Sequence, residues 1–121
     1  MSSLGDTGAE TRARPVIYGE ALFDQFPDGS MVLGGAPLNV AWNLQGLGFD
    51  PLFVTRIGDD VLGEQIYRAL EIRGLDSSAV QVDPDHATGT VCVDIRDGEP
   101  CFEIVDQVAY DFIDSSQLGP V

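Results

Sequence analysis

The chain has 121 residues, which is enough for one hydrophobic core but not for two, and 44% of them are hydrophobic. Its 20 acidic residues outnumber its 6 basic ones and give a net charge of -14, so neither nucleic acid nor an anionic membrane is expected as a partner. No apolar run approaches the ~20 residues of a membrane span and no signal-peptide pattern opens the chain, which predicts a cytoplasmic location.

The chain begins with a lead-in and continues as strands. Residues 1–14 are rich in Gly, Ser, Thr and charged residues and show no apolar period, which predicts a mobile segment. The run from Val16 to Phe26 has a strand-like pattern and is expected to form one first strand. Residues 27–29 are typical of a turn, and residues 31–33 of a short second strand that ends on Gly34-Gly35.

Two helices and further strands are expected downstream. Pro37 presets φ for a helix that Gly46 and Gly48 close, and Asp59 or Asp60 can cap the next helix. The expected elements are a helix over 37–47, a strand over 49–57, a helix over 61–73, a strand over 79–82, and hairpin strands over 89–95 and 101–105.

The order of these elements predicts the fold class. Strand, helix, strand, helix, strand is typical of an α/β fold, a parallel sheet with flanking helices. The hairpins over 16–33 and 89–105 indicate a separate small β-sheet, and such a sheet can act as a lid over a site.

A disulfide and a metal site are both disfavoured by the sequence. A hairpin turning at Asp97-Gly98 places Cys92 opposite Glu103 and only diagonal to Cys101, where disulfide geometry is hard to reach. The single histidine, His86, has no second soft ligand near it in the sequence. We therefore expect free thiols and no bound metal.

A run of small residues at the start of the first expected helix is a candidate binding site. In the run from Gly34 to Ala41, two adjacent glycines let a ligand approach the backbone, and Asn39 carries an amide that both donates and accepts hydrogen bonds. Structural roles explain the same residues. The glycines can form a tight turn, Asn39 can cap a helix or make a buried hydrogen bond, and Asp24 can end its strand in a solvated turn.

The wider pattern resembles the ribokinase-like (PfkB-type) carbohydrate kinase family. The run Gly34-Gly35-Ala36-Pro37-Leu38-Asn39-Val40-Ala41 is followed at the family's spacing by Gly48 and Gly58. Further similar segments are Gly19-Glu20-Ala21-Leu22-Phe23-Asp24, Ile57-Gly58-Asp59-Asp60-Val61-Leu62-Gly63, Thr88-Gly89-Thr90-Val91, Phe102 to Ile104, and Ala109-Tyr110-Asp111. The resemblance spans residues 15–113 and looks most like bacterial fructokinase-like members.

The resemblance implies ATP-dependent phosphorylation of a sugar hydroxyl in a cleft between an α/β domain and a β-sheet lid. By position, Asp24 and Asn39 would bind the sugar. Gly34 and Gly35 would let the sugar approach the backbone, and Phe102 is a candidate for packing on it. Carboxylate and amide groups favour a hydroxyl-bearing ligand because they stay unpaired without one. The sequence does not decide which face of the hairpin Phe102 occupies.

The same resemblance places the catalytic groups outside these segments. The family's second signature, an Asp-Thr segment leading into Gly-Ala-Gly-Asp, supplies the catalytic base and the phosphate-binding groups, and residues 114–121 do not contain it. We therefore expect residues 15–113 to be the sugar-binding part of an incomplete domain, with no catalytic residue and no activity alone. ATP and Mg²⁺ would serve the full-length parent and not bind this chain alone. A homodimer through the lid strands is also implied for the parent.

Fructose or a related hexose is the substrate that the resemblance favours. A nucleoside kinase of the same superfamily is the nearest alternative. A non-catalytic sugar-binding or interaction protein, which keeps the α/β layer without the phosphate site, is an alternative of a different class.

Overall fold

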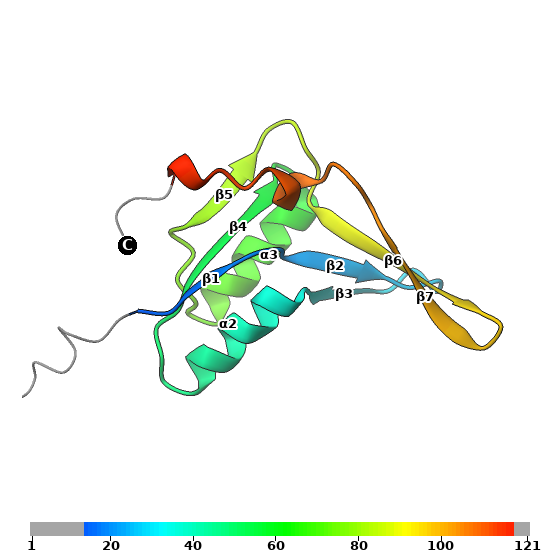
Figure 1. The fold of residues 1–121 in the computed structure, drawn as a ribbon, viewed down its shortest axis with the longest axis horizontal. Coiled ribbons are helices and arrows are strands. Elements are labelled where there is room, and N and C mark those ends of the chain that lie inside the picture. The colour runs from blue at the N-terminus through cyan, green and yellow to red at the C-terminus, as the bar shows by residue number, and fades with distance from the viewer. Residues whose placement is uncertain (1–13, 118–121) are drawn as a thin grey trace, which may run out of the picture.

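The structure, a computed structural model, describes residues 14–117 and contains two sheets (Figure 1). A three-stranded parallel sheet has the order β1-β4-β5, and a four-stranded sheet has the order β3-β2-β6-β7. The strand bounds are Val16–Tyr18 (β1), Leu22–Gln25 (β2), Met31–Gly34 (β3), Leu52–Gly58 (β4), Val80–Asp83 (β5), Gly89–Arg96 (β6) and Glu99–Ile104 (β7). The expected lead-in and the last residues of the chain lie outside the described residues, apart from Arg14 and 114–117.

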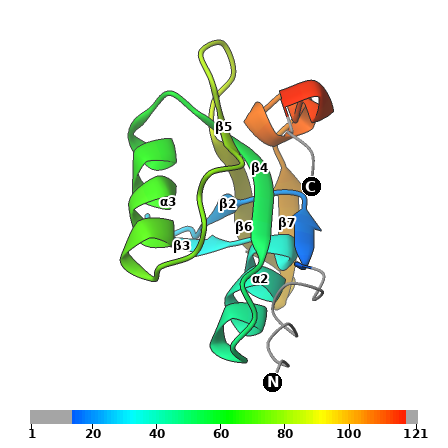
Figure 2. The same cartoon turned by 90° about the vertical axis from the view of Figure 1, so that its left-hand side faces the viewer.

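The parallel sheet is packed between two layers. Helices α2 (Ala36–Gly46) and α3 (Val61–Ile72) cover one face, where Phe53 and Ile57 of β4 belong to a single buried cluster with residues of both helices. The 3₁₀ turns η1 (Ala109–Phe112) and η2 (Ser115–Gln117) lie on the side of β4 opposite to α3 (Figure 2). This arrangement confirms the expected α/β layer with flanking helices.

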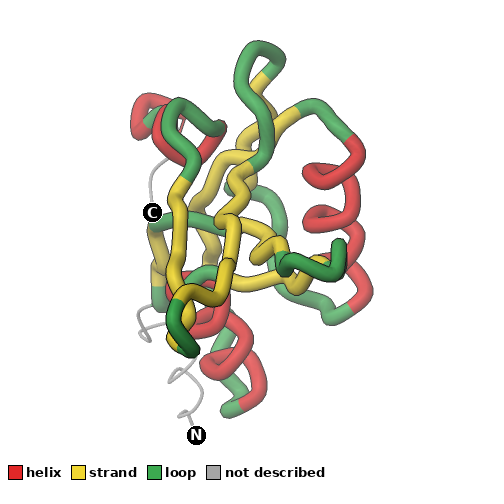
Figure 3. The backbone as a smooth tube through the Cα atoms, turned by 90° about the vertical axis from the view of Figure 1, so that its right-hand side faces the viewer, coloured by secondary structure: helices red, strands yellow, loops and turns green. Residues whose placement is uncertain are grey.

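The four-stranded sheet extends away from this layer (Figure 1), and Figure 3 views the molecule from the side to which it extends. Strands β2 and β6 are its two central strands. Strand β2 pairs antiparallel with β3 and parallel with β6, and β6 and β7 form the expected hairpin. The register places Cys92 opposite Glu103 and Asp94 opposite Cys101, and both cysteines are free. The separate small sheet predicted from the sequence is therefore confirmed, and so is the diagonal placement of the two thiols.

The expectation of one continuous first strand from Val16 to Phe26 was wrong. The run is divided between the two sheets: β1 pairs with β4, and β2 joins the four-stranded sheet. The chain changes direction at Gly19, whose φ of +151° is open to glycine. A Cβ at Gly19 would lie 2.5 Å from Cγ of Pro37, so the connection also packs directly on the first turn of α2. None of the described helices is long and apolar enough to cross a membrane.

Candidate functional site

The carboxylate of Asp24 lies at the centre of the four-stranded sheet. Asp24 pairs with Val32 of β3 and Val91 of β6, and its side chain is half-buried. An ideal Cβ built on Gly34 would lie 3.2 Å from Asp24 Oδ2, so the carboxylate leans over the backbone of Gly34. Asp24 is therefore within a strand and not in a solvated turn, and it faces one of the two glycines that the sequence analysis selected.

The second glycine, Gly35, forms the joint between β3 and α2. It is the N-cap of α2, with a φ of +106° that disfavours residues with a side chain. A Cβ there would lie 2.8 Å from the backbone oxygen of Glu20. The turn after β1 and the turn before α2 thus touch each other, which positions Asp24 relative to the start of the helix.

Asn39 lies in the first turn of α2 with an exposed side chain. Its backbone N–H donates to the Gly35 oxygen at 3.0 Å, but its amide makes no hydrogen bond with another described residue and does not cap the helix. The structural roles that the sequence left open for Asn39, capping and a buried hydrogen bond, are therefore not observed. The amide is free to meet a ligand at this end of the helix.

Phe102 lies on the same sheet face as Asp24 but at a distance from it. Phe102 pairs with Val93, one alternate position beyond Val91, and β7 is two strands away from β2. Two strand spacings correspond to about 10 Å. The side chain is 66% exposed. The structure therefore shows that Phe102 occupies the Asp24 face of the hairpin, which the sequence left open. It does not bring Phe102 next to the other candidate residues.

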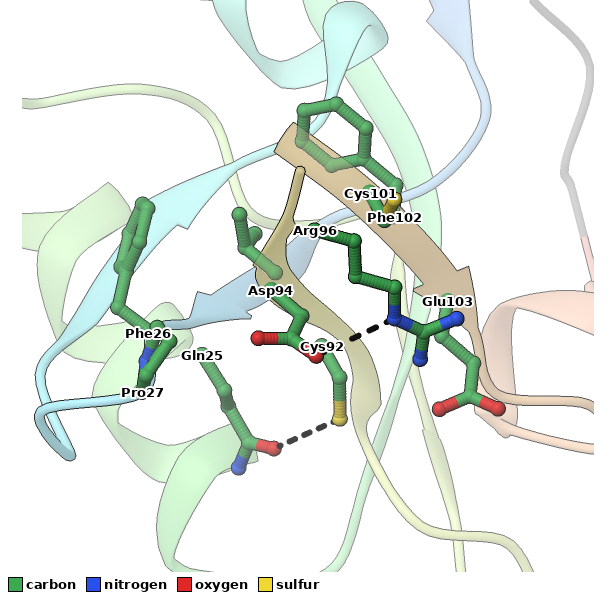
Figure 4. A pocket seen from close by; sticks show the side chains of 10 residues that line it. Gln25, Phe26, Pro27, Cys92, Asp94, Arg96, Cys101, Phe102 and Glu103 are labelled. Carbon is green, nitrogen blue, oxygen red and sulfur yellow. Dashed lines mark hydrogen bonds and ion pairs between the residues drawn. The ribbon is translucent and has the colours of Figure 1, made fainter. Parts of the chain in front are cut away.

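The opposite face of this sheet carries a shallow pocket of about 530 Å³ (Figure 4). Its lining includes Gln25, Cys92, Asp94, Arg96, Cys101 and Glu103, and the predicted site residue Phe102 also borders it. Cys92 Sγ donates to Gln25 Oε1 at 3.6 Å, and Arg96 Nε contacts Asp94 Oδ2 at 3.4 Å. Gln25, Cys92 and Glu103 point away from the Asp24 face, because the two faces of a strand alternate along the chain, whereas Phe102 shares the register of Asp24.

Sequence reasoning missed two residues near the Asp24 face. Glu20 contacts Gly35 through its backbone and side chain, and Tyr110 packs against Gly89 at the start of β6. Burial and then the negative charges of Asp111, Glu20 and Asp106 raise the pKa of the Tyr110 hydroxyl. Both residues lie inside the segments that carried the family resemblance, but Glu20 was expected only as part of the first strand and Tyr110 was not singled out as a candidate.

The basic side chains of residues 14–117 are engaged elsewhere, and the sequence contains no lysine. Arg14 pairs with Asp50 and Asp76, Arg56 with Asp83, Arg68 with Glu64 and Arg96 with Asp94, while Arg73 lies over the ring of Trp42. No group of three or more His, Cys, Asp or Glu among the described residues could hold a metal ion. Triphosphates are bound by cations and positioned donors, and we derive no phosphoryl-transfer step within this part of the chain.

A comparison of this chain with models of known protein families agrees with the glycine pair, the nearby carboxylate and the lid-like sheet. The model of the pfkB family carbohydrate kinases matches residues 10–115. The chain belongs to the pfkB family of carbohydrate kinases. This pfkB chain is 36% identical over 112 residues to a fructokinase of Escherichia coli, an alignment that covers 88% of this chain and 36% of that protein.

Solved structures agree with the family and the fold. The apo structure of a fructokinase from Vibrio cholerae O395 has a TM-score of 0.80 and 32% identity to this pfkB chain, covering 90% of this chain and 40% of that one. The same fructokinase with fructose, ADP and calcium ion bound has a TM-score of 0.74 and 29% identity, covering 90% and 37%. The pfkB chain thus spans well under half the length of these relatives.

Proposed function

We propose that this chain is the sugar-recognition portion of an ATP-dependent carbohydrate kinase, which transfers the γ-phosphate of ATP to a sugar hydroxyl. The observation that carries this proposal is the contact between Asp24 and Gly34, with the free amide of Asn39 at the start of α2. A carboxylate accepts hydrogen bonds from hydroxyls, and an amide can donate and accept them. The glycines have no side chains that would block the approach of a sugar to the backbone. Fructose or a related hexose is the proposed substrate.

The charge of the site supports an uncharged sugar over a sugar acid or a sugar phosphate. Asp24 and Glu20 lie beside the two glycines, and Asp106 and Asp111 lie close enough to Tyr110 to raise its pKa. The arginines of residues 14–117 are engaged elsewhere, as described above. A carboxylate or phosphate on the ligand would therefore meet negative charge without a compensating cation from this part of the kinase.

ATP and Mg²⁺ would bind to other parts of the full-length kinase. The support is the absence of a suitable donor set within residues 14–117. This chain would accordingly be inactive alone, with the base that accepts the sugar's proton supplied from outside these residues.

The parent kinase would form a homodimer through the strands of the lid sheet. Beyond Asp24, the Asp24 face carries exposed apolar side chains on three of the four strands. These are Val32 (53% exposed), Ile95 (67%), Phe102 (66%) and Ile104 (66%). A patch of this kind on a sheet face is stabilised when a second copy covers it.

Titration calorimetry of residues 1–121 tests the sugar site. We expect heat with fructose, weaker or no heat with adenosine and ribose, and none with 2-keto-3-deoxygluconate. Asp24→Asn and Asn39→Ala should abolish the fructose signal, while Asp59→Asn, an exposed carboxylate at the start of α3, should leave it unchanged. Tighter binding of adenosine would favour a nucleoside kinase. Absence of heat with every sugar would favour an interaction role.

A further inference from the structure

The ring of Tyr110 lies directly on the backbone of Gly89. An ideal Cβ built on Gly89 would lie within 2.5 Å of Cδ2 of Tyr110 and 3.5 Å from Cβ of Leu22. Any residue larger than glycine at position 89 would therefore displace the ring. Because the same Cβ direction meets Leu22, the Tyr110 ring lies on the face of the sheet that Leu22 occupies.

This face is the one that carries Asp24. Leu22 and Asp24 are alternate residues of β2, so their side chains point to the same side. Leu22 pairs with Gly34 on one side and with Gly89 on the other. Gly34, Leu22 and Gly89 therefore lie side by side in one row across strands β3, β2 and β6. The Asp24 carboxylate leans over one end of this row, and the Tyr110 ring covers the other end.

The two groups lie at opposite ends of this row. Gly34 and Gly89 lie two strands apart, which corresponds to about 10 Å. Leu22 lies between them and is only 7% exposed, so neighbouring groups of the protein already cover most of it. A sugar ring has C–H bonds on its faces and hydroxyls around its edge. A polar wall at one end and an aromatic wall at the other match that distribution.

Tyr110 is held in place by its neighbours in the chain. The N–H of Ala109 donates to the oxygen of Ala87 at 2.7 Å, and Ala109 and Val108 are buried. The ring remains partly accessible, and its hydroxyl makes no hydrogen bond with another described residue. Burial and then the surrounding carboxylates raise the pKa of this hydroxyl further above neutral pH, so it stays protonated and can donate as well as accept.

We propose that Tyr110 is the second wall of the sugar site and a specificity-determining residue for uncharged hexoses. This inference rests on the proposed function. The ring packs against a C–H face of the sugar, and the hydroxyl exchanges a hydrogen bond with a sugar hydroxyl. The competing explanation is purely structural: the ring fills the space between η1 and β6 and meets no ligand.

Fluorine NMR of residues 1–121 labelled with 3-fluorotyrosine separates these explanations without altering the fold. The chain has 3 tyrosines, so the spectrum is simple, and Tyr→Phe variants assign each signal. We expect fructose to shift the Tyr110 signal and to leave the signal of Tyr67, on helix α3, in place. Gluconate, which is a sugar acid, should shift neither signal.

Two substitutions measure the contribution of Tyr110 to affinity. Tyr110→Phe keeps the ring on Gly89, and loss of one hydrogen bond should weaken fructose binding about 2- to 10-fold. Tyr110→Leu removes the aromatic wall and should weaken binding by about 10-fold or more. Tyr67→Leu is the matched control and should bind as the wild type does. The melting temperature of each variant is measured alongside, so that a loss of folding is recognised.

The outcomes distinguish this inference from the proposed function. If fructose binds, Asp24→Asn abolishes binding, and neither the Tyr110 signal nor the Tyr110→Phe affinity changes, the inference is overturned and the proposed function stands. If the wild type binds no sugar, both are overturned. A fructose-dependent shift of Tyr110 together with weaker binding by a folded Tyr110→Phe supports the inference.

Discussion

The carboxylate of Asp60 accepts hydrogen bonds from both the hydroxyl and the backbone N–H of Thr88, at 2.6 and 3.0 Å. The same carboxylate caps α3 by accepting from the N–H of Gly63 at 2.8 Å. Thr88 immediately precedes β6 and also accepts from the N–H of Gly58 at the end of β4. One side chain thus fixes the start of a lid strand to the parallel sheet and its helix.

Loss of this carboxylate should destabilise the chain. Asp60→Ala removes the helix cap and leaves the buried Thr88, only 2% exposed, without partners for its donors. We expect the free energy of unfolding to fall by about 3 kcal/mol. Asp59→Ala is the matched control, because its side chain makes no hydrogen bond with another described residue, and it should change stability by less than about 0.5 kcal/mol. Urea unfolding followed by circular dichroism measures both; equal losses would contradict the role of Asp60.

The two glycines of the site should respond differently to alanine. In Gly34→Ala, the new Cβ lies 3.2 Å from Asp24 Oδ2, so the carboxylate moves while the backbone stays. We expect weaker fructose binding with stability changed by less than about 1 kcal/mol. In Gly35→Ala, the positive φ and the 2.8 Å approach to the Glu20 oxygen should cost about 1–3 kcal/mol of stability. Unfolding curves measure the stability of both variants, and calorimetry measures their affinity for fructose. A destabilised Gly34→Ala with normal affinity for fructose would count against the sugar site.

Acid should unfold the chain through specific carboxylates. A hydrogen bond from Arg14 lowers the pKa of Asp76 from 3.8 to about 2. Burial favours the neutral form of Asp60, but hydrogen bonds from Thr88 and Gly63 outweigh it and hold the pKa below the usual 3.8. A carboxylate with a lowered pKa in the folded state stabilises that state above its unfolded pKa, and the contribution disappears as the pH falls through the folded value.

Stability should therefore be lost mainly as the pH falls from about 4 to about 2. Urea midpoints measured between pH 6 and pH 2 test this expectation. Asp76→Asn should lower the midpoint at pH 6 and flatten the dependence on pH. A midpoint that is constant down to pH 2 would show that the contacts of these two carboxylates do not stabilise the fold.

The fold class was predictable from the sequence because its signals are local. Pro37 at the start of α2, Asp60 as a cap and the Asp97-Gly98 turn each specify a boundary through their own backbone or side-chain chemistry. The division of the first strand at Gly19 was not predictable in this way. It depends on Gly19 packing against Pro37, which is a contact between segments distant in the sequence.

The candidate site shows the same limit. Asp24, Gly34 and Asn39 were identified because they belong to recognisable segments at fixed spacing. Tyr110 was not among the candidate residues, because an aromatic side chain is more often part of a core than of a site. Only the parallel pairing of β2 with β6 places Gly89, and the ring that covers it, on the face that carries Asp24.

The two cysteines should remain reduced as individual thiols. Cys92 and Cys101 are diagonal neighbours on β6 and β7, and diagonal Cβ atoms are ~7–8 Å apart, well beyond the ~4 Å of a disulfide. Intact-mass measurement after mild oxidation should show no loss of two hydrogens within one chain, and Ellman's reagent should detect both thiols. In Cys92→Ser, one thiol should remain. An internal disulfide formed without unfolding would require a different register of the hairpin.

The exposed apolar patch should control self-association. Ile104 and Phe102 are each 66% exposed on the Asp24 face of β7, and a second copy that covers them would bury both. We expect residues 1–121 to form dimers in sedimentation velocity, and Ile104→Thr to weaken the dimer at least about 10-fold, because a buried isoleucine contributes roughly 1.5–3 kcal/mol. Ile72→Thr is the control, since Ile72 is 85% exposed on α3, away from the lid sheet. A stable monomer, or equal effects of the two substitutions, would exclude this face as the contact between copies.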